Sequence, residues 1–194
     1  MCVNDHDFAE IKAVPYGIYD IGANHGFVNL GQSSDTSEFA VESIRRWWNA
    51  SGKNVYPNAH RILITADCGG SNGYNRRMFK KYLADFAFET GLEVHVSHYP
   101  PGTSKYNKIE HRLFSQISMS MQGQPLVSMY VFQQLIRHTT TTTGLTVDCV
   151  MDKNSYEKGQ KISDSILNTL PVTHKAILGD WNYFFSPVSA VCSP

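Results

Sequence analysis

The sequence predicts a mixed α/β domain, and three patterns indicate that fold class. Residues 14–31 contain two β-rich runs around the turn-prone tetrapeptide at 23–26, which predicts a hairpin. The run RILITAD at 61–67 is apolar and β-branched without alternation, as in a central strand buried on both faces. Amphipathic helical patterns precede and follow this run, so helices alternate with strands along the chain.

The first half of the chain contains two predicted helices. An Asp/Thr/Ser cap region opens the helix predicted at 34–50, which ends near Gly52. Trp47 and Trp48 are adjacent on this helix, so we expect one of them to pack in the core and the other to lie at the surface. The second helix, predicted at 76–91, is closed by its terminal glycine.

The second half continues with shorter elements. A strand is predicted at 92–99 and, after a Pro-Pro-Gly turn, a helix at 107–121. The remaining predicted elements are a helix at 128–139, a strand at 144–151, a helix at 163–170 and an aromatic run at 180–185.

Composition restricts the classes of partner. The 194 residues include 17 Lys plus Arg and 17 Asp plus Glu, so any polyanion must be bound by a local cluster rather than by net charge. Four scattered cysteines without a CxxC pair, and no apolar signal segment, predict a reduced cytoplasmic protein. No apolar run approaches the roughly 20 residues that cross a bilayer, so we expect no membrane association.

Two acidic residues are the main candidates for chemistry. Asp67 ends the strand at 61–67 and Glu110 lies in the first turns of the helix at 107–121, so chain order can bring both to one edge of the sheet. Paired carboxylates can hold the Mg²⁺ ions of two-metal phosphoryl transfer, about 3.5–4 Å apart. Nearby bases would then bind a phosphate backbone. These bases are Lys105, Lys108, His111 and Arg112. In the alternative interpretation, Asp67 is a turn residue and Glu110 a solvated ion-pair partner of Lys105 or Arg112.

Several long motifs resemble one transposase family. AVPYGIYDIGANHGFVNLG, ITADCGGSNGYNRR and HYPPGTSKYNKIEHRLFS, with the order of FAVESIRRWW, TTTTTGLTVDCVMD and GDWNYFF, are similar to the DDE-type insertion-sequence transposases of the Rhodopirellula transposase family. The resemblance covers nearly the whole chain. It implies an RNase H-like mixed sheet flanked by helices and an enzyme that uses Mg²⁺ (or Mn²⁺) for strand transfer at transposon ends. It identifies Asp67 as the second catalytic carboxylate and Glu110 as the third, both metal ligands.

The resemblance also implies a domain organisation. We expect an irregular N-terminal segment at 1–13, a partial RNase H-like catalytic core at 14–122 and a C-terminal extension of helices and short strands at 123–194. The same resemblance implies that the partner is DNA and that the intact enzyme is a homo-oligomer. It also implies that the enzyme is cytoplasmic and associated with the bacterial nucleoid.

The sequence departs from the family pattern at its beginning. The first catalytic Asp of the family lies on a strand upstream of the segment matching NDHDF, and this chain begins at that segment. That strand belongs in the middle of the sheet, between the hairpin and RILITAD, so we expect open backbone on both sides, impaired folding and low turnover of the isolated chain. QGQPL and TTTTTGLTV are also less basic than the family pattern, which loosens phosphate contacts.

Other residues are weaker candidates for ligands. Asp20 is the only acidic residue in the hairpin strands and is either a stand-in first ligand or, as we favour, a strand-end hydrogen-bonding residue. His95 and His98 lie on opposite faces of a strand, which disfavours a zinc pair. Cys68 is expected to be a small buried side chain rather than a nucleophile.

The start of the helix at 76–91 carries a further set of bases. Arg76 and Arg77 either form a solvated face or contact DNA near Asp67.

Three functions are compatible with the sequence. The leading hypothesis is a transposase catalytic core. The second is an inactive remnant that only binds DNA or an intact transposase. The third is a carboxylate-pair hydrolase such as a glycosidase, which needs its two carboxyl groups on either side of a sugar cleft.

Overall fold

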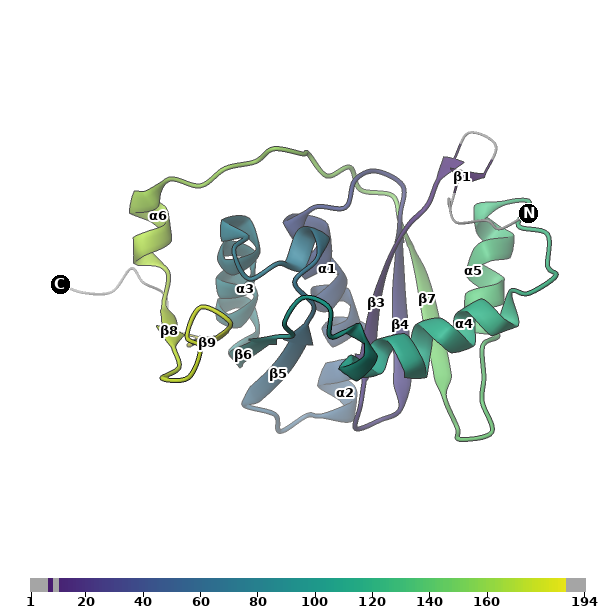
Figure 1. Ribbon diagram of the computed structural model, residues 1–194, viewed down its shortest axis with the longest axis horizontal. Helices are drawn as coiled ribbons and strands as arrows, with labels where there is room; N and C mark the ends of the chain where they lie inside the picture. Colours follow the sequence, from purple (N-terminus) through teal and green to yellow (C-terminus); the bar gives the residue numbers. More distant parts are fainter. Residues whose placement is uncertain (1–6, 9–10, 188–194) are drawn as a thin grey trace. The chain divides into compact units, whose positions relative to one another are not determined.

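The computed structural model describes residues 7–8 and 11–187, and the chain forms two compact units (Figure 1). The first unit comprises Met1–Asp35 and Lys105–Tyr156, and the second comprises Thr36–Ser104 and Glu157–Pro194. Each unit therefore joins two stretches that are distant in the sequence. The mixed α/β class is confirmed, with a three-stranded sheet in the first unit and a four-stranded sheet in the second.

The sheet of the first unit has the strand order β3-β4-β7. The predicted hairpin is confirmed as β3 (Val14–Asp20) antiparallel to β4 (His25–Gly31). Its turn is stabilised by Asp20, whose Oδ1 accepts hydrogen bonds from the backbone N–H groups of Gly22 (2.9 Å) and Ala23 (3.1 Å). The strand β7 (Thr146–Asp152) lies parallel to β4.

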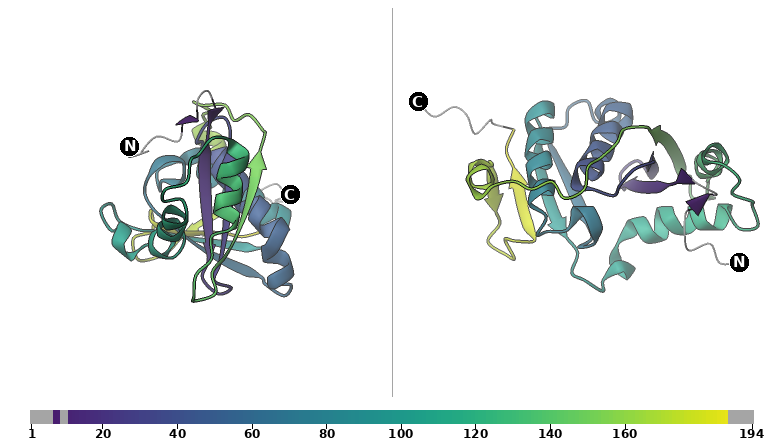
Figure 2. Two further views of the ribbon diagram at one scale, coloured as in Figure 1. Left: turned by 90° about the vertical axis from the view of Figure 1, so that its right-hand side faces the viewer. Right: turned by 90° about the horizontal axis from the view of Figure 1, so that it is seen from above.

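Helices cover this sheet and complete the first core. The predicted helix at 107–121 is present, but a π-helical turn, η4 (Glu110–Phe114), precedes its last segment, α4 (Ser115–Ser120). The helix α5 (Met129–Arg137) runs beside β7 (Figures 1 and 2). The core of this unit is built mainly from Val28, Leu30, Leu113, Ile117, Met129, Phe132, Ile136, Leu145 and Val147.

The N-terminal segment contains two short strands. The strand β1 (Asp7–Phe8) pairs antiparallel with β2 (Ile11–Lys12). Residues 1–6 and 9–10 of the segment predicted to be irregular lie outside the described part of the chain.

The sheet of the second unit has the strand order β5-β6-β9-β8. The strand β5 (Arg61–Ala66) is parallel to β6 (Glu93–His98), and β9 (Asn182–Phe185) is antiparallel to β6. The strand β8 (Val172–His174) pairs with the other side of β9. The aromatic run near the C-terminus is therefore an inner strand, and this explains why the side chains of Tyr183 and Phe185 are fully buried.

Two long helices provide the rest of the second core. The helix α1 (Ser37–Trp47) begins at Thr36, whose hydroxyl accepts from the Phe39 N–H (3.2 Å), and α3 (Arg77–Thr90) ends at left-handed Gly91, as predicted. Figure 2 shows α1 and α3 side by side. The remaining elements are short: η1 (Trp48–Gly52), α2 (Lys53–Val55), η2 (Gly70–Asn72), η3 (Ser104–Tyr106) and α6 (Asp164–Thr169).

The prediction that RILITAD is buried on both faces is wrong. Within the described residues β5 pairs with β6 alone, which makes it the edge strand of its sheet. Its side chains alternate between exposed and partly buried, and Leu63 is 64% exposed. An apolar, β-branched composition therefore identified the strand but not its position at an edge.

The prediction for the adjacent tryptophans is also wrong, because Trp47 and Trp48 are both buried, at 6% and 9% exposure. The helix becomes π-helical at Trp48, which changes the angular step between successive side chains. Gly52 leaves space for the ring, since a Cβ there would lie 2.5 Å from Cε3 of Trp48.

Candidate functional site

Asp67 follows the last residue of β5, and its side chain is exposed. Its Oδ1 accepts a hydrogen bond from the Gly69 N–H at 3.3 Å, which is the turn contact that the alternative interpretation expects. The loop bends sharply after Gly69, because Gly70 adopts a φ of 53° at the start of η2. An exposed carboxylate on a short, tightly folded loop remains accessible to a cation.

A buried histidine holds the backbone of Asp67. His98 ends β6 at 5% exposure, and its Nδ1 lies 3.3 Å from the Asp67 carbonyl oxygen, while its Nε2 lies 2.9 Å from the Tyr183 hydroxyl. A carbonyl can only accept, so Nδ1 carries the proton and Nε2 accepts from Tyr183. Burial lowers the pKa of His98, which favours this neutral form. The sequence predicts a packed or surface histidine here, and the structure adds the contact with Asp67.

Lys80 lies over the same cluster. Its Nζ is 4.8 Å from the centre of the Tyr183 ring. Burial lowers the pKa of Lys80, and the negative charge of Asp180 opposes that shift. Burial also raises the pKa of the Tyr183 hydroxyl, so this tyrosine remains a neutral hydrogen-bond donor to His98.

The other candidates in this unit make internal contacts. Arg76 is exposed, and its Nε donates to the Gly70 carbonyl (3.0 Å), while Arg77 forms an ion pair with Asp164. Desolvation raises the pKa of Cys68, so the thiol form predominates near neutral pH and a nucleophilic role has no support.

The two strand histidines lie on opposite faces, as predicted. His95 is on the half-buried face of β6, where its ring stacks on Phe184 with centroids 5.0 Å apart. His98 is buried on the other face.

Glu110 is the first residue of the π-helical turn η4 and is partly buried. Two glycines let η4 lie unusually close to the hairpin of the first unit. A Cβ at Gly17 would lie 2.5 Å from Cζ of Phe114, and one at Gly26 would lie 2.3 Å from Cδ1 of Leu113. The position of Glu110 is therefore set by a close helix-to-strand contact.

The bases around Glu110 are exposed on the first unit. His111 Nε2 lies 2.9 Å from the Lys105 carbonyl oxygen, and Lys105 Nζ lies over the Tyr106 ring at 5.0 Å. Within the described residues, no ion pair links Glu110 with Lys105 or Arg112. The ion-pair explanation for Glu110 is thus not supported, and the exposed cations are Lys105, Lys108 and Arg112, with the exposed imidazole of His111 among them.

The predicted site residues fall into two local groups. Asp67, Arg76 and Arg77 belong to the second unit, and Glu110 and its neighbouring bases belong to the first. Asp20 accepts two turn hydrogen bonds, as expected for a strand-end residue. Among the described residues, no three His, Cys, Asp or Glu side chains come together in a group that could hold a metal ion.

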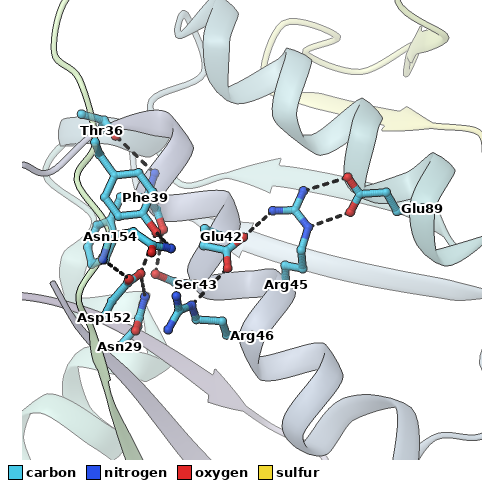
Figure 3. Close-up of polar contacts among 11 residues, drawn as sticks. Asn29, Thr36, Phe39, Glu42, Ser43, Arg45, Arg46, Glu89, Asp152 and Asn154 are labelled. Atoms are coloured by element: carbon cyan, nitrogen blue, oxygen red, sulfur yellow. Dashed lines mark hydrogen bonds and ion pairs between the residues drawn. The ribbon is translucent and has the colours of Figure 1, made fainter.

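Sequence reasoning missed a buried acidic residue, Asp152 at the end of β7 (Figure 3). Its Oδ2 accepts from Asn29 Nδ2 (3.1 Å) and the Tyr156 hydroxyl (2.7 Å), and its Oδ1 accepts from the Asn154 N–H (2.9 Å). Asp152 is fully buried, so these neutral donors compensate its desolvation and indicate a structural role. The spacing of Asp152, Asn154 and Tyr156 was the signal that could have found it.

Figure 3 also shows an ion-pair network of the second unit, in which Arg45 lies between Glu42 and Glu89. Arg46 Nε also contacts Glu42 (3.1 Å). These acidic side chains are neutralised by arginine, so they are poor candidates for metal ligands.

A family comparison decides the assignment of the chain. The model of the Rhodopirellula transposase DDE domain matches residues 1–187. The chain belongs to this DDE transposase family. The resemblance drawn from the motifs is thereby confirmed, and a transposase-type function replaces the glycosidase alternative. No curated protein and no solved structure matched the chain.

None of the helices in the described part of this family member has the length and apolarity to span a membrane.

Proposed function

We propose that this DDE domain binds Mg²⁺ (or Mn²⁺) through Asp67 and Glu110 and acts in DNA strand cleavage and strand transfer at transposon ends. Family membership supports the reaction class. The observation that carries the assignment of Asp67 is its exposed carboxylate at the carboxyl end of β5, on a backbone held by buried His98. Two carboxylates are a suitable oxygen donor set for Mg²⁺.

Each residue has a defined role in this proposal. Asp67 and Glu110 contribute carboxylate oxygens, and a bound divalent ion would activate the attacking oxygen and stabilise the leaving one. Lys105, Lys108 and Arg112 hold the phosphate backbone, with His111, Arg76 and Arg77 as further contacts. We also propose that the intact enzyme acts as a homo-oligomer at the bacterial nucleoid.

The test measures metal binding and strand cleavage separately. Mn²⁺ affinity is measured by calorimetry, and cleavage in Mg²⁺ is measured on a duplex carrying the ends of the element that encodes the chain. Asp67→Asn and Glu110→Gln should each weaken Mn²⁺ binding about tenfold or more. Any cleavage should also be lost.

Matched controls separate this effect from a change in overall charge. Asp85→Asn removes a partly exposed carboxylate that pairs with Lys81, and Glu157→Gln removes an exposed one. Both should bind Mn²⁺ like the parent chain. Parent-like affinity in Asp67→Asn and Glu110→Gln would remove the metal assignment.

A second candidate function is DNA binding without catalysis. It is favoured by the exposure of Lys105, Lys108 and Arg112, because cations that form no ion pair with Glu110 are available for phosphates in the absence of metal. Its signature is salt-sensitive DNA binding that persists in EDTA and in Glu110→Gln, together with absent cleavage.

A further inference from the structure

Two aromatic rings from distant segments stack in the second unit. Tyr74, in the loop after β5, lies on Trp181, which immediately precedes β9, with ring centroids 4.7 Å apart and planes 18° from parallel. Both side chains are only partly buried. Trp47 and Trp48 are buried, so Trp181 is the only one of the 3 tryptophans that is not in the core.

The stacked pair is anchored to the residues that hold Asp67. The Trp181 carbonyl accepts from the His98 N–H at 2.9 Å, and the Tyr74 ring meets the His98 ring edge-on at 6.5 Å. His98 Nδ1 in turn contacts the Asp67 carbonyl oxygen. The rings and the Asp67 loop are therefore fixed to the same buried histidine, and a group bound on the rings lies in the neighbourhood of Asp67.

The surroundings of the pair carry cations. Arg76 is exposed two residues after Tyr74, and Lys80 follows one turn later on α3. Asp180, next to Trp181, is the acidic group whose charge acts on Lys80. Aromatic rings near cationic side chains are the combination that binds single-stranded DNA, because each base has a stackable face and each nucleotide a phosphate.

We propose that Tyr74 and Trp181 form a stacking site for an unpaired DNA base, which positions a single strand beside Asp67. The proposal rests on the proposed function, since it takes DNA as the substrate, and it adds the strand form and the residues that hold it. A ring pair that only covers the core would pack against His98 but would have no affinity for a base.

The experiment uses the full chain in EDTA and follows tryptophan emission during titration with oligo(dT). Stacking of thymine on Trp181 should quench the emission of this tryptophan. Trp47 and Trp48 are buried and cannot contact the strand, so the change in emission reports on Trp181. The strand should bind more tightly than a blunt duplex of the same length. Tyr74→Ala and Trp181→Ala should each weaken binding about tenfold.

Two substitutions serve as controls. Trp181→Phe keeps a stackable ring but removes the reporter, so affinity measured by anisotropy of a labelled strand should stay near that of the parent while the quench disappears. Phe88→Ala removes an aromatic side chain on α3 that is 59% exposed and should leave binding unchanged.

The possible results separate this proposal from the proposed function. Unchanged emission at saturating oligo(dT), parent-like affinity of both alanine variants, or no binding of single strands would each overturn the stacking site. If an alanine variant fails to fold, the quenching of tryptophan emission in the parent chain still tests the stacking site. Metal-dependent cleavage without quenching would remove only the stacking site, and quenching without Mn²⁺ binding at Asp67 would remove only the catalytic role.

Discussion

A Cβ atom added to Gly26 of β4 would lie 2.3 Å from Cδ1 of Leu113 in η4, a leucine that is fully buried. Neither strand nor helix can give way easily, because Leu113 is surrounded by the first-unit core. The glycine is therefore a steric requirement for packing η4, and so for placing Glu110.

We expect Gly26→Ala to lower the free energy of unfolding by about 1–3 kcal/mol through overpacking. Gly17→Ala should cost less, because Phe114 is only partly buried and its ring can tilt. Urea denaturation measures both, with Ser118→Ala on the exposed side of α4 as a control that should stay within about 0.5 kcal/mol. A Gly26→Ala chain as stable as the parent would contradict the close contact.

Leu63 tests whether the outward face of β5 is open to solvent. Because it is largely exposed, Leu63→Ser should cost less than about 1 kcal/mol. Val96→Ser, on the buried side of β6, should cost about 2–4 kcal/mol. Equal losses in urea denaturation would indicate that Leu63 is covered in solution.

His98 should make stability depend on pH. Its pKa in the fold is below the ordinary value of 6.5, so below about pH 6.5 the unfolded chain takes up a proton that the folded chain does not. Stability should therefore be present above that pH and be lost as the pH falls toward the lower pKa of the folded state. Thermal unfolding between pH 8 and 5 measures this.

The matched variants for this prediction are His98→Asn and His60→Gln. His98→Asn should flatten the pH dependence, whereas His60→Gln, at an exposed histidine, should preserve it. A slope that survives in His98→Asn must come from other groups.

The basic cluster should contribute a salt-dependent part of DNA affinity. Lys105→Ala, Lys108→Ala and Arg112→Ala should each weaken binding to any sequence and reduce the slope of log K against log salt by about 1. Lys53→Ala, an exposed lysine of α2, is the control. Unchanged slopes in all three variants would show that DNA does not use this surface.

Local patterns predicted most of the elements. Two β-rich runs around turn residues identified the β3–β4 hairpin, while a cap at Thr36 and left-handed Gly91 marked helix ends. These features depend on neighbours in the sequence, so the sequence alone contains the information. Motif resemblance, rather than periodicity, gave Asp67 and Glu110 their proposed roles.

Features that depend on distant partners were not predictable in this way. Whether β5 is central or at an edge depends on which strands pair with it, and the aromatic run of β9 resembles a loose end until β6 and β8 are placed beside it. The stacking of Tyr74 on Trp181 joins two loops that no local pattern connects. The close packing of Leu113, in the π-helical turn η4, against Gly26 likewise joins residues that are distant in the sequence.

The inner position of β9 has a consequence for synthesis on the ribosome. The first-unit sheet has all of its strands once Asp152 has been translated, but the second-unit sheet lacks its third strand until residues 182–185 emerge. During that interval the nascent polypeptide presents β6 with one side unpaired, a state that attracts chaperones or neighbouring chains. Slower elongation over residues 153–181 would prolong this exposure and lower the yield of native protein.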